Sequence, residues 1–188
     1  MLSYWMGRLW LGLFGWKIQG EPLSHKKFVL IAAPHTSNWD LPFMLATAYV
    51  MGVRLSWFGK HTVFKWPWRW LLRKLGGISV DRRSPQSLVR QLAEQFRSRD
   101  DLILAVSPEG TRSKARFWKS GFYHIAIESR VPIGLGYLDY SRKLCGLGMF
   151  VKPGGNVNED MDQIRAFYRN IRGKYPELES EPRLREET

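Results

Sequence analysis

A histidine and an aspartate follow an apolar stretch in the segment LIAAPHTSNWDLPFM, residues 30–44. If both lay on one helix, five residues at 3.6 per turn would leave the side chains of His35 and Asp40 about 140° apart. Pro42 belongs in the first turn of a helix, so we expect that helix to begin near Asp40. The preceding residues then form a loop that can curl back and bring the His35 imidazole to the Asp40 carboxylate.

Two interpretations of this pair are open. A neutral histidine is a general base near pH 7. A carboxylate on its other ring nitrogen fixes the tautomer and stabilises the imidazolium that forms when the ring takes a proton. No serine nucleophile is needed if the reacting hydroxyl belongs to a substrate. Alternatively, Asp40 only caps the helix and His35 is an ordinary loop residue, and the spacing alone does not separate the two.

A second group of polar residues lies in the segment SPEGTRSK, residues 107–114. Gly110 permits a tight turn whose N–H groups can face an anion, and Arg112 can bind a phosphate through two parallel hydrogen bonds. Glu109 can orient Arg112 or accept a hydrogen bond from a substrate hydroxyl. A solvated basic turn is the alternative. The segment GGISVDRR places Arg82 at the end of a strand, which alone indicates only an Asp–Arg pair.

Strand-like and helix-like segments alternate along the chain, without a repeat or a linker. The expected strands are 27–34, 53–59, 78–81, 101–108, 131–140 and 144–153, and the expected helices are 41–52, 66–77, 84–99, 120–130 and 159–175. This alternation predicts a single α/β domain in which helices flank a central, largely parallel sheet. Functional sites in such sheets lie at the carboxyl ends of the strands. We divide the chain into an N-terminal helix (1–19), the domain (20–176) and a charged tail (177–188) that is expected to be frayed.

The composition points to an anionic partner. Lys and Arg outnumber Asp and Glu by 29 to 17, giving a net charge of +12, and a basic surface attracts nucleic acid, anionic lipid or phosphorylated substrates. Nine tryptophans favour lipid, because their rings prefer the boundary between hydrocarbon and water. The single cysteine allows no internal disulfide and fits a reducing compartment.

The N-terminal segment MLSYWMGRLWLGLFGWKI is apolar and aromatic but shorter than the ~20 residues that cross a bilayer. It has no signal-peptide pattern. We expect an amphipathic helix in the membrane interface with Trp5, Trp10 and Trp16 as contacts, and a helix packed on the core is the alternative. The protein would then be peripheral or monotopic at the cytoplasmic face of the inner or plasma membrane.

Four ordered segments resemble the motifs of the glycerolipid acyltransferase family, whose familiar members are the 1-acylglycerol-3-phosphate (lysophosphatidic acid) acyltransferases. The resemblance covers about residues 27–135. The four segments are HTSNWD, then GK followed by GGISVDRR, then SPEGTRSK followed by FWKSG, and finally VPIGLG. A His-x4-Asp pair is common by chance, whereas four segments in this order are specific.

The resemblance implies an O-acyltransferase. His35, helped by Asp40, would take the proton from an acceptor hydroxyl, which attacks an acyl thioester of coenzyme A or acyl carrier protein without a covalent acyl-enzyme. The acceptor would be a lysolipid, 1-acylglycerol-3-phosphate or a related lyso-phospholipid, and no cofactor is implied beyond the acyl thioester as co-substrate. The substrate-binding residues implied around the acceptor phosphate are Glu109, Gly110, Thr111, Arg112, Arg82 and Lys60.

Two rival functions use the same features. A lipid or thioester hydrolase would apply the His–Asp pair to water, although a G-x-S-x-G elbow is absent. A basic nucleic-acid-binding module fits the charge, but the sequence has no helix-turn-helix, zinc-finger spacing or RNP-like strand, so we expect no nucleic-acid partner. The remaining histidines are scattered, and no metal site is expected.

Overall fold

The computed structural model describes residues 2–20, 23–64, 67, 69–81 and 84–187. Within them, seven strands form one curled sheet in the order β1-β7-β6-β2-β5-β3-β4. The strands are β1 (Lys17–Ile18), β2 (Lys27–Ala33), β3 (Leu55–Lys60), β4 (Gly77–Val80), β5 (Leu102–Val106), β6 (Ile133–Asp139) and β7 (Leu144–Val151). All six strands that the sequence predicts are therefore confirmed.

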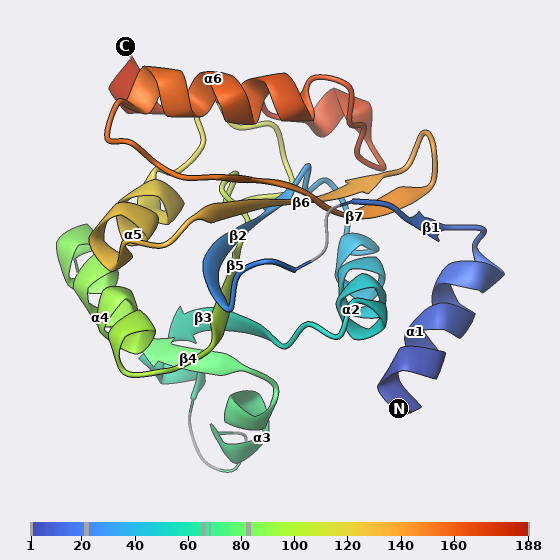
Figure 1. Ribbon diagram of the computed structural model, residues 1–188, viewed down its shortest axis with the longest axis horizontal. Helices are drawn as coiled ribbons and strands as arrows, with labels where there is room; N and C mark the ends of the chain where they lie inside the picture. The colour runs from blue at the N-terminus through green and yellow to red at the C-terminus, as the bar shows by residue number, and fades with distance from the viewer. Residues whose placement is uncertain (1, 21–22, 65–66, 68, 82–83, 188) are drawn as a thin grey trace.

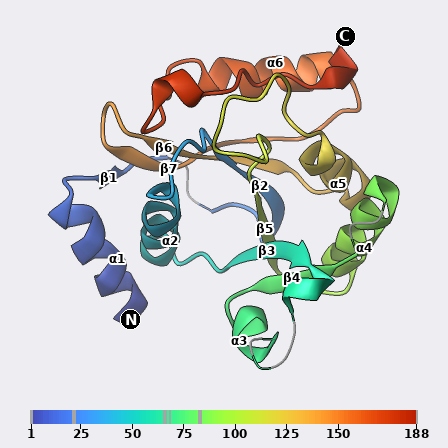
Figure 2. The ribbon, with the colours of Figure 1, turned by 180° about the vertical axis from the view of Figure 1, so that it is seen from behind.

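Helices flank this sheet. They are α1 (Leu2–Leu13), α2 (Asp40–Val50), α3 (Arg69–Lys74), α4 (Pro85–Arg97), α5 (Gly121–Ser129) and α6 (Val157–Tyr168), with short 3₁₀ turns η1 (His61–Val63), η2 (Pro176–Leu178) and η3 (Arg185–Glu187). In Figures 1 and 2, α6 lies along one face of the sheet, α4 and α5 lie at one side, and α2 and α1 lie at the other. The expected α/β domain with flanking helices is confirmed.

Five strands run in the same direction. β2 pairs in parallel with β5 and β6, and β3 pairs in parallel with β4 and β5. β7 is antiparallel to β6, and β1 is parallel to β7. The central strand β2 is apolar on both faces, since Val29 and Ile31 are fully buried on one face and Phe28 is buried on the other. The carboxyl ends of β2, β5 and β6 consequently meet at one edge of the sheet.

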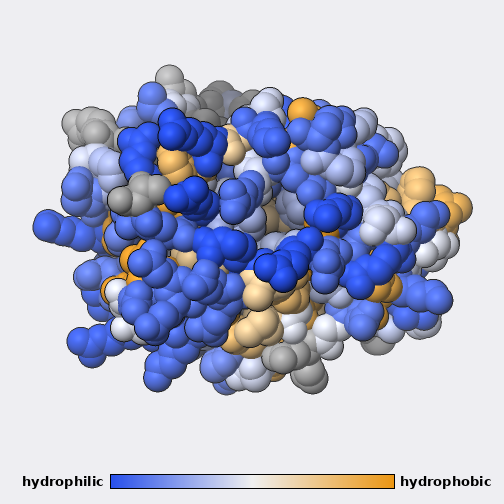
Figure 3. Space-filling model, turned by 90° about the horizontal axis from the view of Figure 1, so that it is seen from above, coloured by the Kyte–Doolittle hydropathy of each residue, from blue (hydrophilic) through white to orange (hydrophobic). Residues whose placement is uncertain are grey.

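The first helix is amphipathic and packs on α2. Gly7 marks the closest approach, since a Cβ atom there would lie 2.6 Å from the carbonyl oxygen of Ala46. The opposite side of α1 exposes apolar side chains, among them Trp5 (65% exposed) and Leu9 (74%). Figure 3 shows a hydrophobic patch at the right-hand edge of an otherwise largely hydrophilic face, on the side where α1 lies in Figure 1. No helix in the described part of the chain is both long and apolar enough to cross a membrane.

The expected membrane contact at Trp16 is wrong. This ring is buried, and it stacks on Phe43 at a centroid distance of 4.5 Å while its edge meets Tyr140 at 4.9 Å. Trp10 is half-buried against Phe14 and the start of α2. The apolar periodicity identified the helix, but the chain turns back at Gly15 and carries Trp16 into the core.

The expected fraying of the C-terminal tail is also wrong. Leu184 is fully buried, and the carbonyl oxygen of Arg183 accepts a 2.8 Å hydrogen bond from the N–H of Trp118. The Ser180 hydroxyl accepts a 2.9 Å bond from the N–H of Ala115. The tail is charged along its length, yet its few apolar and small residues point inward and attach it to the loop after β5.

Candidate active site

The loop between β2 and α2 brings His35 to Asp40 as the sequence predicts. The helix begins at Asp40, and the Nδ1 atom of His35 lies 2.9 Å from the Oδ2 atom of Asp40. The same oxygen accepts hydrogen bonds from the N–H groups of Thr36 (3.0 Å) and Ser37 (2.9 Å). Asp40 therefore does not cap its own helix. It closes the preceding loop around its carboxylate and orients the imidazole.

A tyrosine that the sequence analysis did not identify completes the carboxylate's environment. The phenol of Tyr140, directly after β6, donates a 2.8 Å hydrogen bond to the Oδ1 atom of Asp40. Burial, followed by this hydrogen bond, raises the pKa of Tyr140 above its usual value. Four donors thus fix the nearly buried carboxylate. With Nδ1 facing Asp40, the Nε2 atom of His35 makes no hydrogen bond to another described residue and is the nitrogen available as a base.

Glu109 lies behind His35 and not beside Arg112. Its Oε2 atom accepts a 2.8 Å hydrogen bond from the backbone N–H of His35, and the residue is 3% exposed. Burial raises the pKa of Glu109 to about 7. Its Oε1 atom is buried and has no hydrogen-bond partner among the described residues. The expectation that Glu109 orients Arg112 is therefore wrong, and the carboxyl supports the backbone of the histidine loop.

Arg112 is held at the same loop by a different residue. Its guanidinium donates to the Oδ1 atom of Asn38, which the sequence analysis did not single out. Gly110 has φ of +66°, a left-handed backbone conformation that favours glycine because it has no Cβ atom. The Thr111 hydroxyl accepts a 3.2 Å bond from the N–H of Ser113. The structure therefore brings Arg112 to the His–Asp pair, while Gly110 and Thr111 form the exposed turn that presents it.

The two remaining predicted substrate contacts are Lys60 and Arg82. Lys60 is exposed at the end of β3 and does not line the cavity described below. Arg82 lies outside the described residues, so its contact stays a prediction. No cluster of three or more His, Cys, Asp or Glu side chains that could hold a metal ion occurs in the described part of the chain.

An apolar cavity of about 350 Å³ leads away from the His–Asp pair. His35, Asn38 and Arg112 line one end, where the parallel strands finish, and Leu23 and Phe28 line the region near the start of β2. Apolar side chains of β2, β3, β5 and α2 form its walls. Five residue steps of strand β2, at about 3.3 Å each, separate Phe28 from Ala33, so the cavity follows the strand for roughly 17 Å towards His35. Its shape fits a long, unbranched apolar chain whose reactive end lies at His35.

Comparisons with known proteins agree with this architecture. A family profile described as Acyltransferase matches residues 16–134. A 1-acyl-sn-glycerol-3-phosphate acyltransferase of Limnanthes douglasii is 31% identical over 131 residues, which are 66% of this chain and 45% of that protein. The protein of the same name from Limnanthes alba is 30% identical over 135 residues, 68% of this chain and 47% of that protein. The chain therefore spans about half the length of these relatives.

The fold has a counterpart among solved structures. The crystal structure of the 1-acyl-sn-glycerophosphate (LPA) acyltransferase PlsC from Thermotoga maritima aligns with a TM-score of 0.59 at 20% sequence identity, covering 86% of this chain and 73% of that one. This similarity supports the α/β architecture. The matched family profile covers more than half of the chain and includes His35, Asp40 and Arg112. The chain belongs to the acyltransferase family.

Proposed function

We propose that this protein is a membrane-surface O-acyltransferase. It moves an acyl chain from an acyl thioester, acyl-CoA or acyl carrier protein, to a hydroxyl of a lysolipid, which is 1-acylglycerol-3-phosphate or a related lyso-phospholipid. The observation that carries the proposal is the His35 ring, oriented by Asp40 and placed where an apolar cavity meets the Arg112 guanidinium. An acyl chain fits the cavity, and a phosphate fits the guanidinium.

The chemistry follows from the orientation of the ring. The Nε2 atom of His35 takes the proton of the acceptor hydroxyl, and the Asp40 carboxylate stabilises the imidazolium. The acceptor oxygen attacks the thioester carbonyl and forms a tetrahedral intermediate. Collapse of this intermediate breaks the carbon–sulfur bond, the thiol leaves with the proton returned by His35, and the ester is complete. The same imidazole takes the proton from the acceptor hydroxyl and returns it to the leaving thiol, so no second base is needed.

The exposed side of α1 supports a membrane-surface location. Its apolar side chains include Leu2 (77% exposed), Trp5 and Leu9, and such a helix lies in the boundary between headgroups and acyl chains. The net charge of +12 favours anionic lipid. Both a lysolipid acceptor and its product would reside in that membrane. We place the protein as a peripheral enzyme at the cytoplasmic face of the inner or plasma membrane.

The test is product analysis with purified protein, acyl-CoA and a lysolipid, each present or absent. His35→Ala should abolish ester formation, whereas His124→Ala, on the exposed side of α5, should leave it unchanged. Thiol release that does not depend on the lysolipid would identify a hydrolase. Near wild-type transfer by His35→Ala would show that another group is the base.

A further inference from the structure

The loop that follows α6 lies directly against the histidine loop. The N–H of Tyr175 donates a 3.1 Å hydrogen bond to the Thr36 hydroxyl. A Cβ atom on Gly173 would lie 2.8 Å from the same hydroxyl oxygen and 3.3 Å from the Cβ atom of Pro34, so the backbone at Gly173 packs closely against these two side chains. Residue 174 is therefore held next to the catalytic pair, although nearly 140 positions separate it from His35 in the sequence.

The residue at this position is a lysine surrounded by aromatic rings. The Nζ atom of Lys174 lies 6.0 Å from the ring centroid of Trp39, 5.6 Å from that of Tyr140 and 5.8 Å from that of Tyr175. Ring faces attract an ammonium group and hold it in place, but they leave its charge uncompensated. Tyr140 is the residue that bonds Asp40, and Trp39 directly follows Asn38, which holds Arg112. Lys174 and Arg112 are therefore attached to the same short loop.

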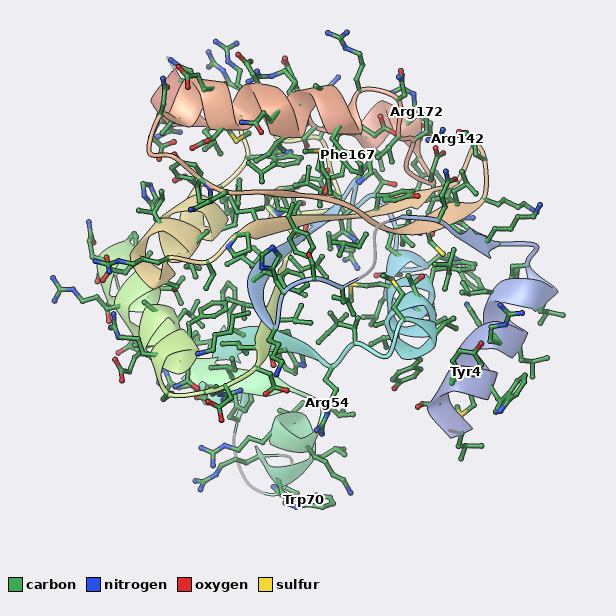
Figure 4. The ribbon with its side chains drawn as sticks, in the orientation of Figure 1. Tyr4, Arg54, Trp70, Arg142, Phe167 and Arg172 are labelled. Carbon is green, nitrogen blue, oxygen red and sulfur yellow. The ribbon has the colours of Figure 1, made fainter. Side chains whose placement is uncertain are left out.

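Two basic residues near Lys174 differ from it in having acidic partners. Arg142 and Arg172 lie near each other on the β6–β7 hairpin and after α6 (Figure 4). Arg142 pairs with Asp139 at 2.5 Å, and Arg172 pairs with Glu179 at 3.4 Å. Lys174 makes no ion pair with a described carboxylate. Asp40 forms its hydrogen bonds with His35, Thr36, Ser37 and Tyr140, and Lys174 is not among these partners.

We infer that Lys174 binds a phosphate monoester of a substrate, together with Arg112 at the other side of the histidine loop. A phosphate monoester carries close to two negative charges at pH 7, which two cations match. Both the headgroup of a 1-acylglycerol-3-phosphate and the 3′-phosphate of coenzyme A present this group. The inference rests on the proposed acyl transfer, and it assigns a binding role to a residue outside the four motifs that resemble the family.

The experiment measures the Michaelis constants of both substrates for Lys174→Met, Lys174→Arg and a matched control, Lys152→Met, which lies after β7. The probes are oleoyl-CoA with 1-oleoylglycerol 3-phosphate, each also replaced by its phosphate-free counterpart, oleoyl-3′-dephospho-CoA or 1-oleoylglycerol. Lys174→Met should raise the Michaelis constant of one phosphate-bearing substrate about tenfold or more, with kcat changed less than twofold. Lys174→Arg should restore it, and Lys152→Met should change neither constant.

The outcome also identifies the source of the phosphate. A rise for 1-oleoylglycerol 3-phosphate but not for 1-oleoylglycerol assigns Lys174 to the acceptor headgroup. A rise for oleoyl-CoA but not for its dephospho form assigns it to the donor. Equal losses in Lys174→Met and Lys174→Arg, or a fall in kcat with both Michaelis constants unchanged, would overturn the inference. Absence of any transfer by the wild-type enzyme would instead refute the proposed function itself.

Discussion

Replacement of Asp40 by asparagine tests how the carboxylate acts. In the structure, the Oδ2 atom accepts from two backbone N–H groups and from the His35 ring, whereas the Oδ1 atom faces the hydroxyl of Tyr140. An amide must therefore place its oxygen toward Thr36 and Ser37 and its NH₂ group toward Tyr140, whose oxygen can accept. The imidazole would keep a hydrogen-bond acceptor on Nδ1, and its tautomer would not change.

Asp40→Asn is consequently expected to remove only the negative charge beside the His35 ring. A hydrogen bond to an ionised partner is worth about 1.5–3 kcal/mol and one between neutral groups about 1 kcal/mol, so the imidazolium loses roughly 1–2 kcal/mol of stabilisation. That corresponds to a decrease of about 5- to 30-fold in kcat/KM. A substitution that forced the wrong tautomer would instead cost about 10⁴-fold.

The assay is thiol release from acyl-CoA, dependent on the lysolipid, measured from pH 5 to 9. Asp40→Ala serves as the comparison, because it removes the acceptor of the ring and of two backbone N–H groups and should be far less active. Tyr140→Phe combined with Asp40→Asn leaves the buried amide NH₂ group unpaired. The double variant should therefore show a larger fall in thermal midpoint than the falls of the two single variants added together. A 10⁴-fold loss in Asp40→Asn alone would refute the argument from the two backbone donors.

Three further predictions follow from burial and exposure. Because burial raises the pKa of Glu109 from 4.5 to about 7, the unfolded chain releases this proton first, so Glu109 lowers stability as the pH rises from about 4.5 to 7. Glu109→Gln should flatten that part of a plot of thermal midpoint against pH, and an unchanged plot would contradict the burial argument. Ala48→Phe fills the cavity beside α2 and should shift the preferred donors toward shorter acyl chains in a competition between thioesters of different length. Leu9→Glu should weaken cosedimentation with anionic vesicles about tenfold or more, since burial of a leucine contributes about 1.5–3 kcal/mol. Asn158→Glu on α6 introduces the same charge and is the control. An equal loss of vesicle binding in both variants would point to net charge alone.

The sequence contained enough information to predict the centre of the site. Pro42 set the start of α2, and this start made residues 35–39 a loop able to fold back. The alternation of strands and helices placed that loop and the Arg112 turn at the same edge of a parallel sheet. These predictions succeed for two reasons. The start of a helix is set by nearby residues, and the loops that follow parallel strands lie together because the carboxyl ends of those strands meet at one edge of the sheet.

The supporting residues could not be found in this way. Tyr140 lies 100 positions from the carboxylate it bonds, and nothing in its local pattern distinguishes it from any tyrosine at a strand end. Glu109 was placed beside Arg112 because the two are close in sequence, yet its carboxyl turns to the backbone of His35. Trp16 has the residue type of an interfacial anchor, but a turn at Gly15 reverses its direction. In each case the side chain's direction is set by tertiary packing.

The part of the chain after α6 connects these observations. Glu179, in the charged tail, accepts a 2.6 Å hydrogen bond from the N–H of Gly173, and the next contacts along this loop are those of Lys174 with the aromatic rings and of Tyr175 with Thr36. The tail therefore fixes the loop that contacts the His35 loop, although it lies outside residues 16–134 that match the family profile. We therefore propose that a segment outside the family motifs determines how firmly the base is held and which charge faces the substrate beside it.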